Sequence, residues 1–332
     1  MEKEAATGTD LNKHTMNDIL KLLLIEKDYL SGEYIAERLG ISRTAVWKHI
    51  KQLRKKGFDI FSSPNKGYLL RSFPECLIIP EMVELYYKDN LPFKVIYLDQ
   101  VDSTNNYAKE MALKGEKKNF LVITDNQTSG RGRFNRSWIS QKGKDLTFSI
   151  CLKLNKSIQD FYKFTILSGL AVYHTLRDFI SEGQKEFLKI KWPNDIYFEN
   201  KKICGILSEM ITEEMIMNYI IIGIGINVNS RRLYENAISL CEIINKEIDR
   251  NYWLSIFLRY FAEFYSYYEN GEFLKVYEEW KKNMGWIEKD IRFDNGKEII
   301  EGVLEDVSEN GGIIIRKGKA VNTYYSGDLL IR

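Results

Sequence analysis

The chain has few residues of the kinds that cross-link or bind metals: four cysteines and three histidines among 332 residues. Cys76, Cys151, Cys204 and Cys241 are far apart, form no CxxC pair and have no histidine cluster nearby. We therefore expect neither a disulfide framework nor a zinc site. Free thiols of this kind are typical of proteins in a reducing cytoplasm.

The chain also lacks long apolar runs and an excess of charge of one sign. No apolar run reaches the ~18 residues that a membrane span needs, and the polar amino end, 1–15, has no apolar core like that of a signal peptide. The net charge of +2 gives no whole-protein attraction to nucleic acid, so any such site has to be local. We expect a cytoplasmic protein of two or three domains, with no membrane partner.

The first part of the chain has the pattern of a winged helix-turn-helix domain, 16–72. Apolar residues at helical spacing begin near Asn17, and Ser31 and Ser42 are placed to cap a second and a third helix. Gly40 is placed to end the second helix. Two short strands then surround the turn 63–67. A connector with one short helix, 73–90, is expected to follow.

This domain is predicted to bind DNA. The amino end of the third helix suits the major groove, while lysines on that helix and on the wing suit phosphates. One short basic helix binds weakly alone, so a dimer on a two-part site is expected. The alternative is a helical protein-interaction module with a solvated basic face. The candidate DNA contacts are Ser42, Arg43, Thr44, Lys48, Asn65 and Lys66.

Residues 91–282 are predicted to form a central α+β domain on a mixed or antiparallel sheet. Strand-like runs recur at 94–98, 120–124, 146–152, 188–191, 195–198, 203–209 and 219–226. Helical patterns lie at 103–114, 159–180 and 253–268. The domain has neither the GxGxxG context of a Rossmann unit nor a GxxxxGK[ST] phosphate loop.

The segment Gly130–Trp138 packs two glycines, three arginines and a tryptophan into nine residues. Glycine lets a backbone approach a ligand closely, and arginine forks match phosphate or carboxylate oxygens in pairs. An aromatic ring beside them can stack on a nucleobase. The pattern predicts a loop that closes over an anionic, nucleotide-like ligand; the alternative is a basic surface loop.

Other polar clusters lie at strand ends, and each alone has a structural alternative such as a helix cap. The run 102–105 opens a helix, and Gln127 follows an apolar strand. In 191–195 a lysine, a tryptophan and a proline precede Asn194 and Asp195, which offer the hard oxygen ligands that Mg²⁺ prefers. Lys202 precedes a Cys-Gly pair, and 223–227 places two glycines at the end of an apolar strand.

In this order, the runs 130–138, 191–195, 202–205 and 223–227 resemble the motifs of the biotin protein ligases. With the amino-terminal domain, the chain is similar to the bifunctional bacterial form, which is a ligase and a biotin-operon repressor. The resemblance covers 16–332. It implies a class II synthetase-like central domain and, for the short alternating strands of 283–332, a small SH3-like β-barrel.

The resemblance implies a two-step reaction. Biotin and ATP give biotinyl-5'-AMP and pyrophosphate, and a lysine of biotin carboxyl carrier protein, in acetyl-CoA or pyruvate carboxylase, then takes the biotin. It also implies catalytic roles for Arg133, Lys191 and Lys202, and Mg²⁺ at Asp195. The biotin contacts implied are Ser103, Thr104, Asn105, Gln127, Arg131, Gly132, Arg133, Lys202 and Gly205. The ATP and adenylate contacts implied are Gly130, Arg131, Arg136, Trp138, Lys191, Asn194 and Asn227.

The resemblance further implies a homodimer favoured by biotinyl-5'-AMP that represses genes of biotin synthesis or uptake. The loop departs from the best-known form at Phe134 and Asn135, which is expected to change loop order or adenylate retention. Two alternatives stay open: a lipoate- or octanoate-type ligase, and a biotin-sensing repressor without catalysis.

Overall fold

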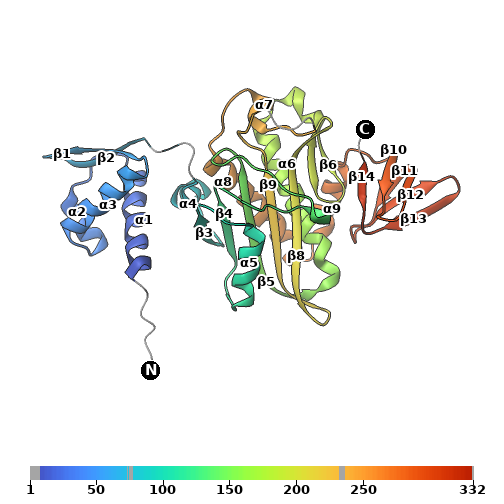
Figure 1. Ribbon diagram of the computed structural model, residues 1–332, viewed down its shortest axis with the longest axis horizontal. Helices are drawn as coiled ribbons and strands as arrows, with labels where there is room; N and C mark the ends of the chain where they lie inside the picture. Colours follow the sequence, from blue (N-terminus) through green and yellow to red (C-terminus); the bar gives the residue numbers. More distant parts are fainter. Residues whose placement is uncertain (1–7, 73, 75–77, 232–235, 331–332) are drawn as a thin grey trace. The chain divides into compact units, whose positions relative to one another are not determined.

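The computed structural model describes residues 8–72, 74, 78–231 and 236–330, in two compact units that divide between Lys88 and Asp89 (Figure 1). No helix within the described ranges is both long enough and apolar enough to cross a membrane. Cys76 lies outside these ranges, whereas Cys151, Cys204 and Cys241 are buried and free.

The first unit confirms the predicted helix-turn-helix and its caps. The Ser31 hydroxyl accepts from the backbone N–H of Tyr34, and the Ser42 hydroxyl accepts from that of Ala45. Gly40 adopts the left-handed conformation that ends the second helix. The elements are α1 (Gly8–Glu26), α2 (Gly32–Leu39), α3 (Arg43–Lys55), β1 (Asp59–Ser63), β2 (Gly67–Ser72) and α4 (Pro80–Tyr87).

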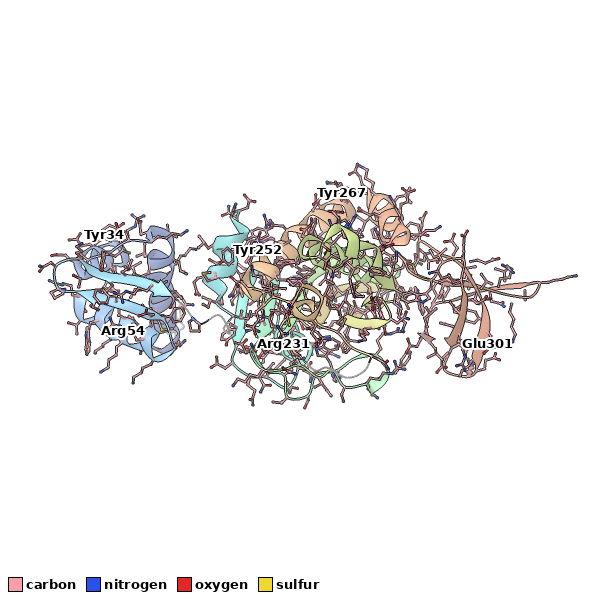
Figure 2. All side chains as sticks on the ribbon, turned by 90° about the horizontal axis from the view of Figure 1, so that it is seen from above. Tyr34, Arg54, Arg231, Tyr252, Tyr267 and Glu301 are labelled. Carbon is pink, nitrogen blue, oxygen red and sulfur yellow. The ribbon has the colours of Figure 1, made fainter. Side chains whose placement is uncertain are left out.

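Arg54, near the end of α3, binds the hairpin that follows it. The Nε of Arg54 donates to the backbone oxygen of Ile60 at 2.8 Å, and its Nη2 lies 2.6 Å from the Ser62 hydroxyl. Arg54 therefore fastens the end of α3 to the antiparallel β1–β2 hairpin (Figure 2). The helix expected in the connector, α4, packs against α1 within this unit, where Lys21 and Glu84 form an exposed ion pair.

The second unit is built on a seven-stranded mixed sheet of order β3-β4-β5-β9-β8-β7-β6. The pair β3–β4 is parallel and the other neighbours are antiparallel, which confirms the predicted sheet type. Figure 1 shows β8 and β9 as long neighbouring strands. The strands are β3 (Lys94–Leu98), β4 (Phe120–Thr124), β5 (Leu146–Ser157), β6 (Leu188–Lys191), β7 (Asp195–Phe198), β8 (Lys201–Glu213) and β9 (Ile216–Ile226).

Helices cover both faces of this sheet. Cys151 packs with Ala108 and Ala112 of α5, while the ring of Phe148 lies 5.2 Å from that of Phe257 on α8. Because side chains alternate along a strand, positions 148 and 151 of β5 face opposite sides. The helices are α5 (Thr104–Leu113), α6 (Phe161–Phe179), α7 (Leu240–Ile244), α8 (Arg250–Glu269) and α9 (Phe273–Lys282), with 3₁₀ turns η1 (Arg133–Asn135), η2 (Ile158–Asp160) and η3 (Glu182–Phe187).

The end of the chain forms a five-stranded antiparallel sheet of order β13-β12-β11-β10-β14. Trp192, in the loop between β6 and β7, is buried against it: its indole N–H donates to the Gly311 oxygen at 2.8 Å, and its ring meets that of Phe293 edge-on. This sheet is thereby held to the loop that carries Asn194 and Asp195. The strands are β10 (Asp290–Asp294), β11 (Ile299–Val307), β12 (Ile313–Lys317), β13 (Ala320–Tyr324) and β14 (Asp328–Leu330).

Candidate functional site

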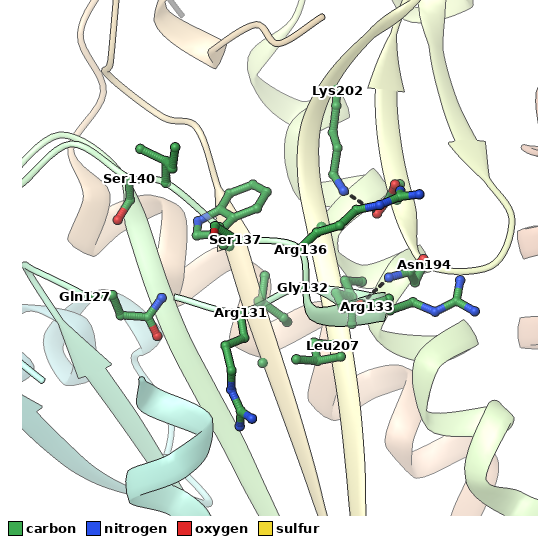
Figure 3. A pocket seen from close by; sticks show the side chains of 18 of the residues that line it. Gln127, Arg131, Gly132, Arg133, Arg136, Ser137, Ser140, Asn194, Lys202 and Leu207 are labelled. Atoms are coloured by element: carbon green, nitrogen blue, oxygen red, sulfur yellow. Dashed lines mark hydrogen bonds and ion pairs between the residues drawn. The ribbon is translucent and has the colours of Figure 1, made fainter. Parts of the chain in front are cut away.

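A cavity of about 580 Å³ opens at the amino end of α5, between the segment 130–138 and the strands β8 and β9. All the residues predicted for biotin, nucleotide and metal line it, except Gly130 and Lys191. Figure 3 shows Gln127 and Arg131 toward one side, and Lys202, Asn194 and Arg133 toward the other. Segments far apart in the sequence thus converge on one cavity.

One end of the cavity is polar, buried and largely uncharged. The backbone N–H and the hydroxyl of Thr104 both donate to Oε1 of Gln127, at 2.8 and 3.1 Å. The Ser149 hydroxyl lies 2.7 Å from that of Thr104 and 2.6 Å from Oδ1 of Asn105. The Asn105 amide donates to Glu209 at 2.7 Å. These hydrogen bonds fix the side chains before any ligand enters.

Two glycines of β9 let the side chains of Asn105 and Trp138 pack directly on the strand backbone. A Cβ on Gly223 would lie 2.2 Å from Oδ1 of Asn105, and one on Gly225 would lie 2.3 Å from the Trp138 indole. Such separations are impossible between non-bonded atoms, so only glycine fits either position. The Trp138 indole therefore lies directly on the backbone of Gly225, and Asn105 lies on that of Gly223.

The glycine-arginine segment forms a short closed loop. The N–H of Trp138 donates to the Gly130 oxygen at 2.9 Å, and that of Gly132 to the Arg136 oxygen at 2.7 Å. Gly130 is therefore at the base of the loop, packed on Gln127 and Trp138. At the tip, Phe134 is exposed and has a φ of 54°.

The unusual Phe134 is partly covered by the cations of its own loop. The guanidinium carbons of Arg133 and Arg136 lie 4.9 and 5.9 Å from its ring centre, as in cation–π pairs. Arg131 is turned the other way, where it bonds Asn106 and lies 3.8 Å from Glu209. The three arginines thus serve the two ends of the cavity separately.

At the other end, cations are paired with two carboxylates. Nζ of Lys202 lies 2.8 Å from Oδ1 of Asp195. Asp328, at the start of β14, accepts from Arg136 at 2.5 Å and from Lys191 at 3.2 Å. Lys191 does not line the cavity; its side chain is only 6% exposed and lies behind Asp328. Lys191 is predicted to contact ATP, but here its ammonium group is paired with Asp328 of the C-terminal sheet and does not line the cavity.

The two cations beside Asp328 lower the pKa of its carboxyl. Burial raises the pKa of its carboxyl, but the charges and hydrogen bonds of Lys191 and Arg136 outweigh burial, so the pKa lies below its ordinary value. Two other predicted residues are held by the backbone: the amide of Asn194 donates to the Ile206 oxygen, and that of Asn227 to the Ile238 oxygen at 3.2 Å. Both side chains thus shape the wall of the cavity.

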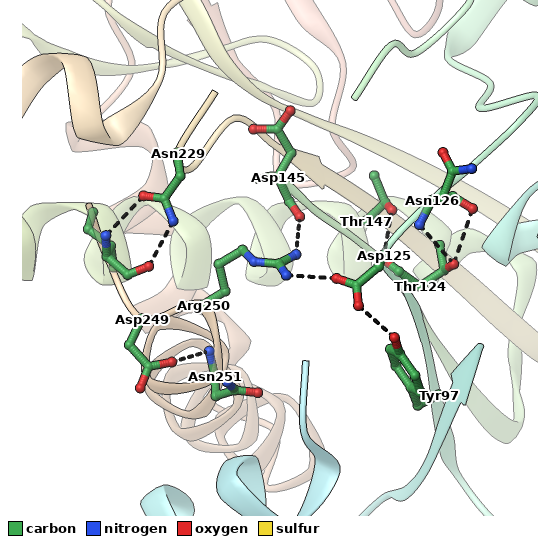
Figure 4. A network of polar contacts seen from close by, with 11 residues as sticks. Tyr97, Thr124, Asp125, Asn126, Asp145, Thr147, Asn229, Asp249, Arg250 and Asn251 are labelled. Carbon is green, nitrogen blue, oxygen red and sulfur yellow. Dashed lines mark hydrogen bonds and ion pairs between the residues drawn. The ribbon is translucent and has the colours of Figure 1, made fainter. Parts of the chain in front are cut away.

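A buried arginine holds the loops at the Trp138 side of the cavity. Arg250, the first residue of α8, is fully buried and donates to the Asp125 carboxylate and to the Asp145 backbone oxygen, each at 2.7 Å (Figure 4). Tyr97 donates its hydroxyl to the same Asp125 carboxylate at 2.6 Å. The contact joins α8 to the ends of β3, β4 and the strand-entry loop of β5.

The carboxylate of Asp145 extends this network to the cavity. It accepts from the backbone N–H of Gln141 at 2.8 Å and from that of Val228 at 3.1 Å. Burial raises the pKa of the Asp145 carboxyl, although these N–H donors oppose the effect. Asp145, Gln141 and the neighbouring Asn227 all line the cavity, so the network around Arg250 sets the position of that wall.

Sequence reasoning missed Asp328, Asp145 and Glu209. Asp328 stands alone between a glycine and two leucines, 192 residues after Arg136 of the glycine-arginine loop, and nothing in the neighbouring sequence marks it. Asp145 did carry a signal, because a carboxylate directly before a long apolar strand is unusual unless it is hydrogen-bonded. Glu209 follows a strand pattern that looks merely alternating.

Two family models match the chain: the biotin/lipoate A/B protein ligase family over 97–227, and an HTH domain over 15–69. The chain is 33% identical to the bifunctional ligase/repressor BirA of Bacillus subtilis, over 91% of this chain and 94% of that protein. The chain belongs to the biotin/lipoate A/B protein ligase family.

Other members of the ligase family agree with this assignment. The bifunctional ligase/repressor BirA of Escherichia coli is 28% identical over 93% of this chain and 95% of its own length. The biotin protein ligase of Aquifex aeolicus, solved in complex with biotin and ATP, has a TM-score of 0.62 and 30% identity. That likeness covers 72% of this chain and 98% of the Aquifex chain.

The lowered pKa of Asp328 predicts a pH-dependent stability difference in this ligase-family chain. Its charge stabilises the fold above the ordinary aspartate pKa of about 4, and this stabilisation is lost as the pH falls through the lower pKa of the folded state. We expect Asp328→Asn to lose roughly 1–3 kcal/mol of unfolding free energy at pH 7, as for a hydrogen bond to a charged group. The loss should shrink below about pH 4. Denaturant unfolding across this pH range measures it.

The matched control is Glu301→Gln, which alters an exposed pair with Arg292 in the same sheet. Because exposed pairs contribute little, this variant should unfold like the parent protein at every pH. An Asp328→Asn difference that stays constant down to about pH 2 would contradict the assignment of the charge.

Proposed function

We propose that this chain is a biotin protein ligase that also represses transcription in response to biotin. It forms biotinyl-5'-AMP from biotin and ATP, then transfers biotin to a lysine of biotin carboxyl carrier protein. The observation that carries this is one cavity with a largely uncharged hydrogen-bonding end and a cationic end, in a chain of the ligase family. Such a cavity matches a neutral ring that carries a carboxylate and reacts with a polyphosphate.

The uncharged end suits the ring system of biotin. A cyclic urea presents one carbonyl acceptor and two N–H donors, and the groups around Thr104, Asn105 and Gln127 offer both kinds of partner. Burial makes each unmatched donor or acceptor costly, which favours a ligand with this pattern over a plain fatty acid. Ser103 lies beside them at the cavity wall.

The cationic end suits the reacting phosphates. A biotin carboxylate oxygen attacks the α-phosphorus of ATP, the bond from that phosphorus to the bridging oxygen breaks, and pyrophosphate leaves with the electron pair. Lys202, Arg133 and Arg136 all line this end of the cavity. We expect them to stabilise the charge that develops on the phosphates. Lys191 supports them by holding Asp328. Catalysis then rests on positioning and electrostatics.

The second step needs no protein nucleophile either. The carrier lysine, as a free amine, attacks the carbonyl carbon of the mixed anhydride, the carbonyl–oxygen bond to phosphate breaks, and AMP leaves while the amine loses a proton. We expect Lys202, which lines the cavity, to contact that carbonyl and the leaving phosphate. The loop 130–138 shields the anhydride from water before the carrier arrives.

The residues of this site fit a Mg²⁺ ion that is bound mainly by the phosphates of ATP. Mg²⁺ is usually held by one or two carboxylates together with substrate phosphates, and Asp195 offers one carboxylate at the cavity wall. Among the residues that the structure describes, no group of three or more metal-binding side chains is present. Asp195 would hold the ion through ATP, and the ion would neutralise phosphate charge.

The remaining domains complete the proposal. We infer a winged helix-turn-helix domain at 16–72 that contacts DNA through Ser42, Arg43, Thr44, Lys48, Asn65 and Lys66. A linker at 73–90, a class II synthetase-like ligase domain at 91–282 and an SH3-like domain at 283–332 follow. Biotinyl-5'-AMP favours a homodimer on a two-part operator, and the carrier protein of acetyl-CoA or pyruvate carboxylase is the other partner.

Pyrophosphate release from ATP and Mg²⁺ with biotin, lipoate or octanoate tests the enzyme directly. Of the three acids, we expect only biotin to give pyrophosphate release. In Lys202→Ala and Arg133→Ala the rate of release should fall about 10²–10³-fold, the effect of removing one donor to developing charge. The exposed neighbour Lys201→Ala is the control and should react like the parent chain. Release of pyrophosphate with lipoate or octanoate would indicate the related ligase. If no acid gave release although biotin bound tightly, the chain would be a biotin sensor without catalysis.

The two glycines of β9 give a sharper test of which end binds what. Gly223→Ala displaces Asn105, so it should weaken biotin binding at least tenfold and leave ATP binding nearly unchanged. Gly225→Ala displaces the Trp138 indole, so it should weaken ATP binding and spare biotin. Calorimetric titration of each variant with each ligand measures both. Equal losses for both ligands in both variants would contradict the assignment of the two ends.

Repression predicts that DNA binding depends on the adenylation step. A random duplex library, selected with the full chain, should yield a two-part site only when biotin and ATP are both present. Lys202→Ala, which forms little adenylate, should select that site poorly unless biotinyl-5'-AMP is added. Equal affinity for the site with and without biotin and ATP would show that the first unit binds DNA independently of the ligand.

A further inference from the structure

The exposed face of α3 has a tryptophan at its centre. Trp47 is 52% exposed, although tryptophan is among the residues that gain most from burial. Val46, His49, Ile50 and Leu53 form the buried face of the same helix. The capped amino end of α3 fixes which residues share the outer face, so the exposure of Trp47 follows from the fold of the helix.

The neighbours of Trp47 on this face are cationic. Arg43 and Lys51 lie one turn before and one turn after it, and Lys48 is adjacent; all three are exposed. Nζ of Lys51 lies 5.2 Å from the centre of the indole ring. The indole is therefore a single apolar surface surrounded by positive charge, on the helix proposed to enter the major groove.

Other exposed aromatic groups of the first unit are arranged differently. Phe61, on the wing, is covered by the Arg71 guanidinium at 3.9 Å and meets the ring of Tyr29 edge-on. Tyr34 lies on α2, and not on the helix that carries most of the predicted DNA contacts. Trp47 differs from both because it shares its face with Arg43, Thr44 and Lys48, three predicted DNA contacts.

We propose that Trp47 reads the 5-methyl group of a thymine in each half of the operator. Of the groups that base pairs present in the major groove, the thymine methyl is the apolar one, and apolar side chains recognise it by contact. The surrounding cations match phosphates and supply affinity without sequence preference. Trp47 thus adds sequence preference that these cations do not supply. This inference rests on the proposed DNA-binding function.

Deoxyuridine substitution isolates this contact, because uracil pairs like thymine and lacks only the methyl. With the selected duplex site, biotin and ATP, each thymine is replaced in turn, and affinity is measured for the parent chain, Trp47→Ala and Trp47→Phe. We expect one position in each half-site where deoxyuridine weakens the parent chain about tenfold and does not weaken Trp47→Ala further. Trp47→Phe should retain part of the thymine preference.

Two comparisons separate recognition from general damage. Trp47→Ala should bind a scrambled duplex as tightly as the parent chain, and Tyr34→Ala, which removes an exposed ring from α2, should retain the full thymine preference. Circular dichroism melting shows whether each variant is folded.

Each result decides a different question. If the parent chain selects no site, the proposed DNA-binding function fails. If it selects a site and no thymine position couples to Trp47, the inference about Trp47 is overturned. The inference is also overturned if Trp47→Ala melts like the parent chain and loses equal affinity for the selected and the scrambled duplex, because the ring then contributes only general affinity.

Discussion

The site depends on the close approach of two side chains to the bare backbone of β9. Asn105 and Trp138 lie where a Cβ on Gly223 or Gly225 would overlap them, so the strand itself forms the floor of the cavity. Side chains alternate along a strand, and two glycines two residues apart therefore clear one continuous strip on one face. Ile222, Ile224 and Ile226 alternate with them and face the opposite side of the sheet, where they are buried.

The cationic end depends on a second constraint, the balance of charge. A buried lysine is costly unless it is paired, and Asp328 pairs Lys191 while also holding Arg136 of the loop. The C-terminal sheet is thus part of the cavity wall. A polyphosphate that enters this end competes with Asp195 and Asp328 for the same cations, so part of its attraction to them replaces ion pairs that already exist.

Local features of the site could be predicted from the sequence, and long-range ones could not. The caps at Ser31 and Ser42 and the glycine-rich loop depend on neighbours a few residues away, and the structure has them as expected. The burial of Lys191 depends on Asp328, which belongs to another sheet. Arg250 pairs with Asp125, which is 125 residues away in the chain. Helix α9 was missed even though Phe273, Val276, Tyr277 and Trp280 have helical spacing and are buried.

The motif 191–195 shows why a conspicuous run need not have one role. Lys191 bonds Asp328, Trp192 bonds the oxygen of Gly311, and Asp195 pairs with Lys202. Three neighbouring residues therefore connect the ligase sheet, the C-terminal sheet and the cavity. A substitution at Trp192 would act on the cavity through the position of β14 and Asp328, without any contact between the indole and a ligand. Activity lost in a variant of this motif consequently reports on domain packing as well as on chemistry.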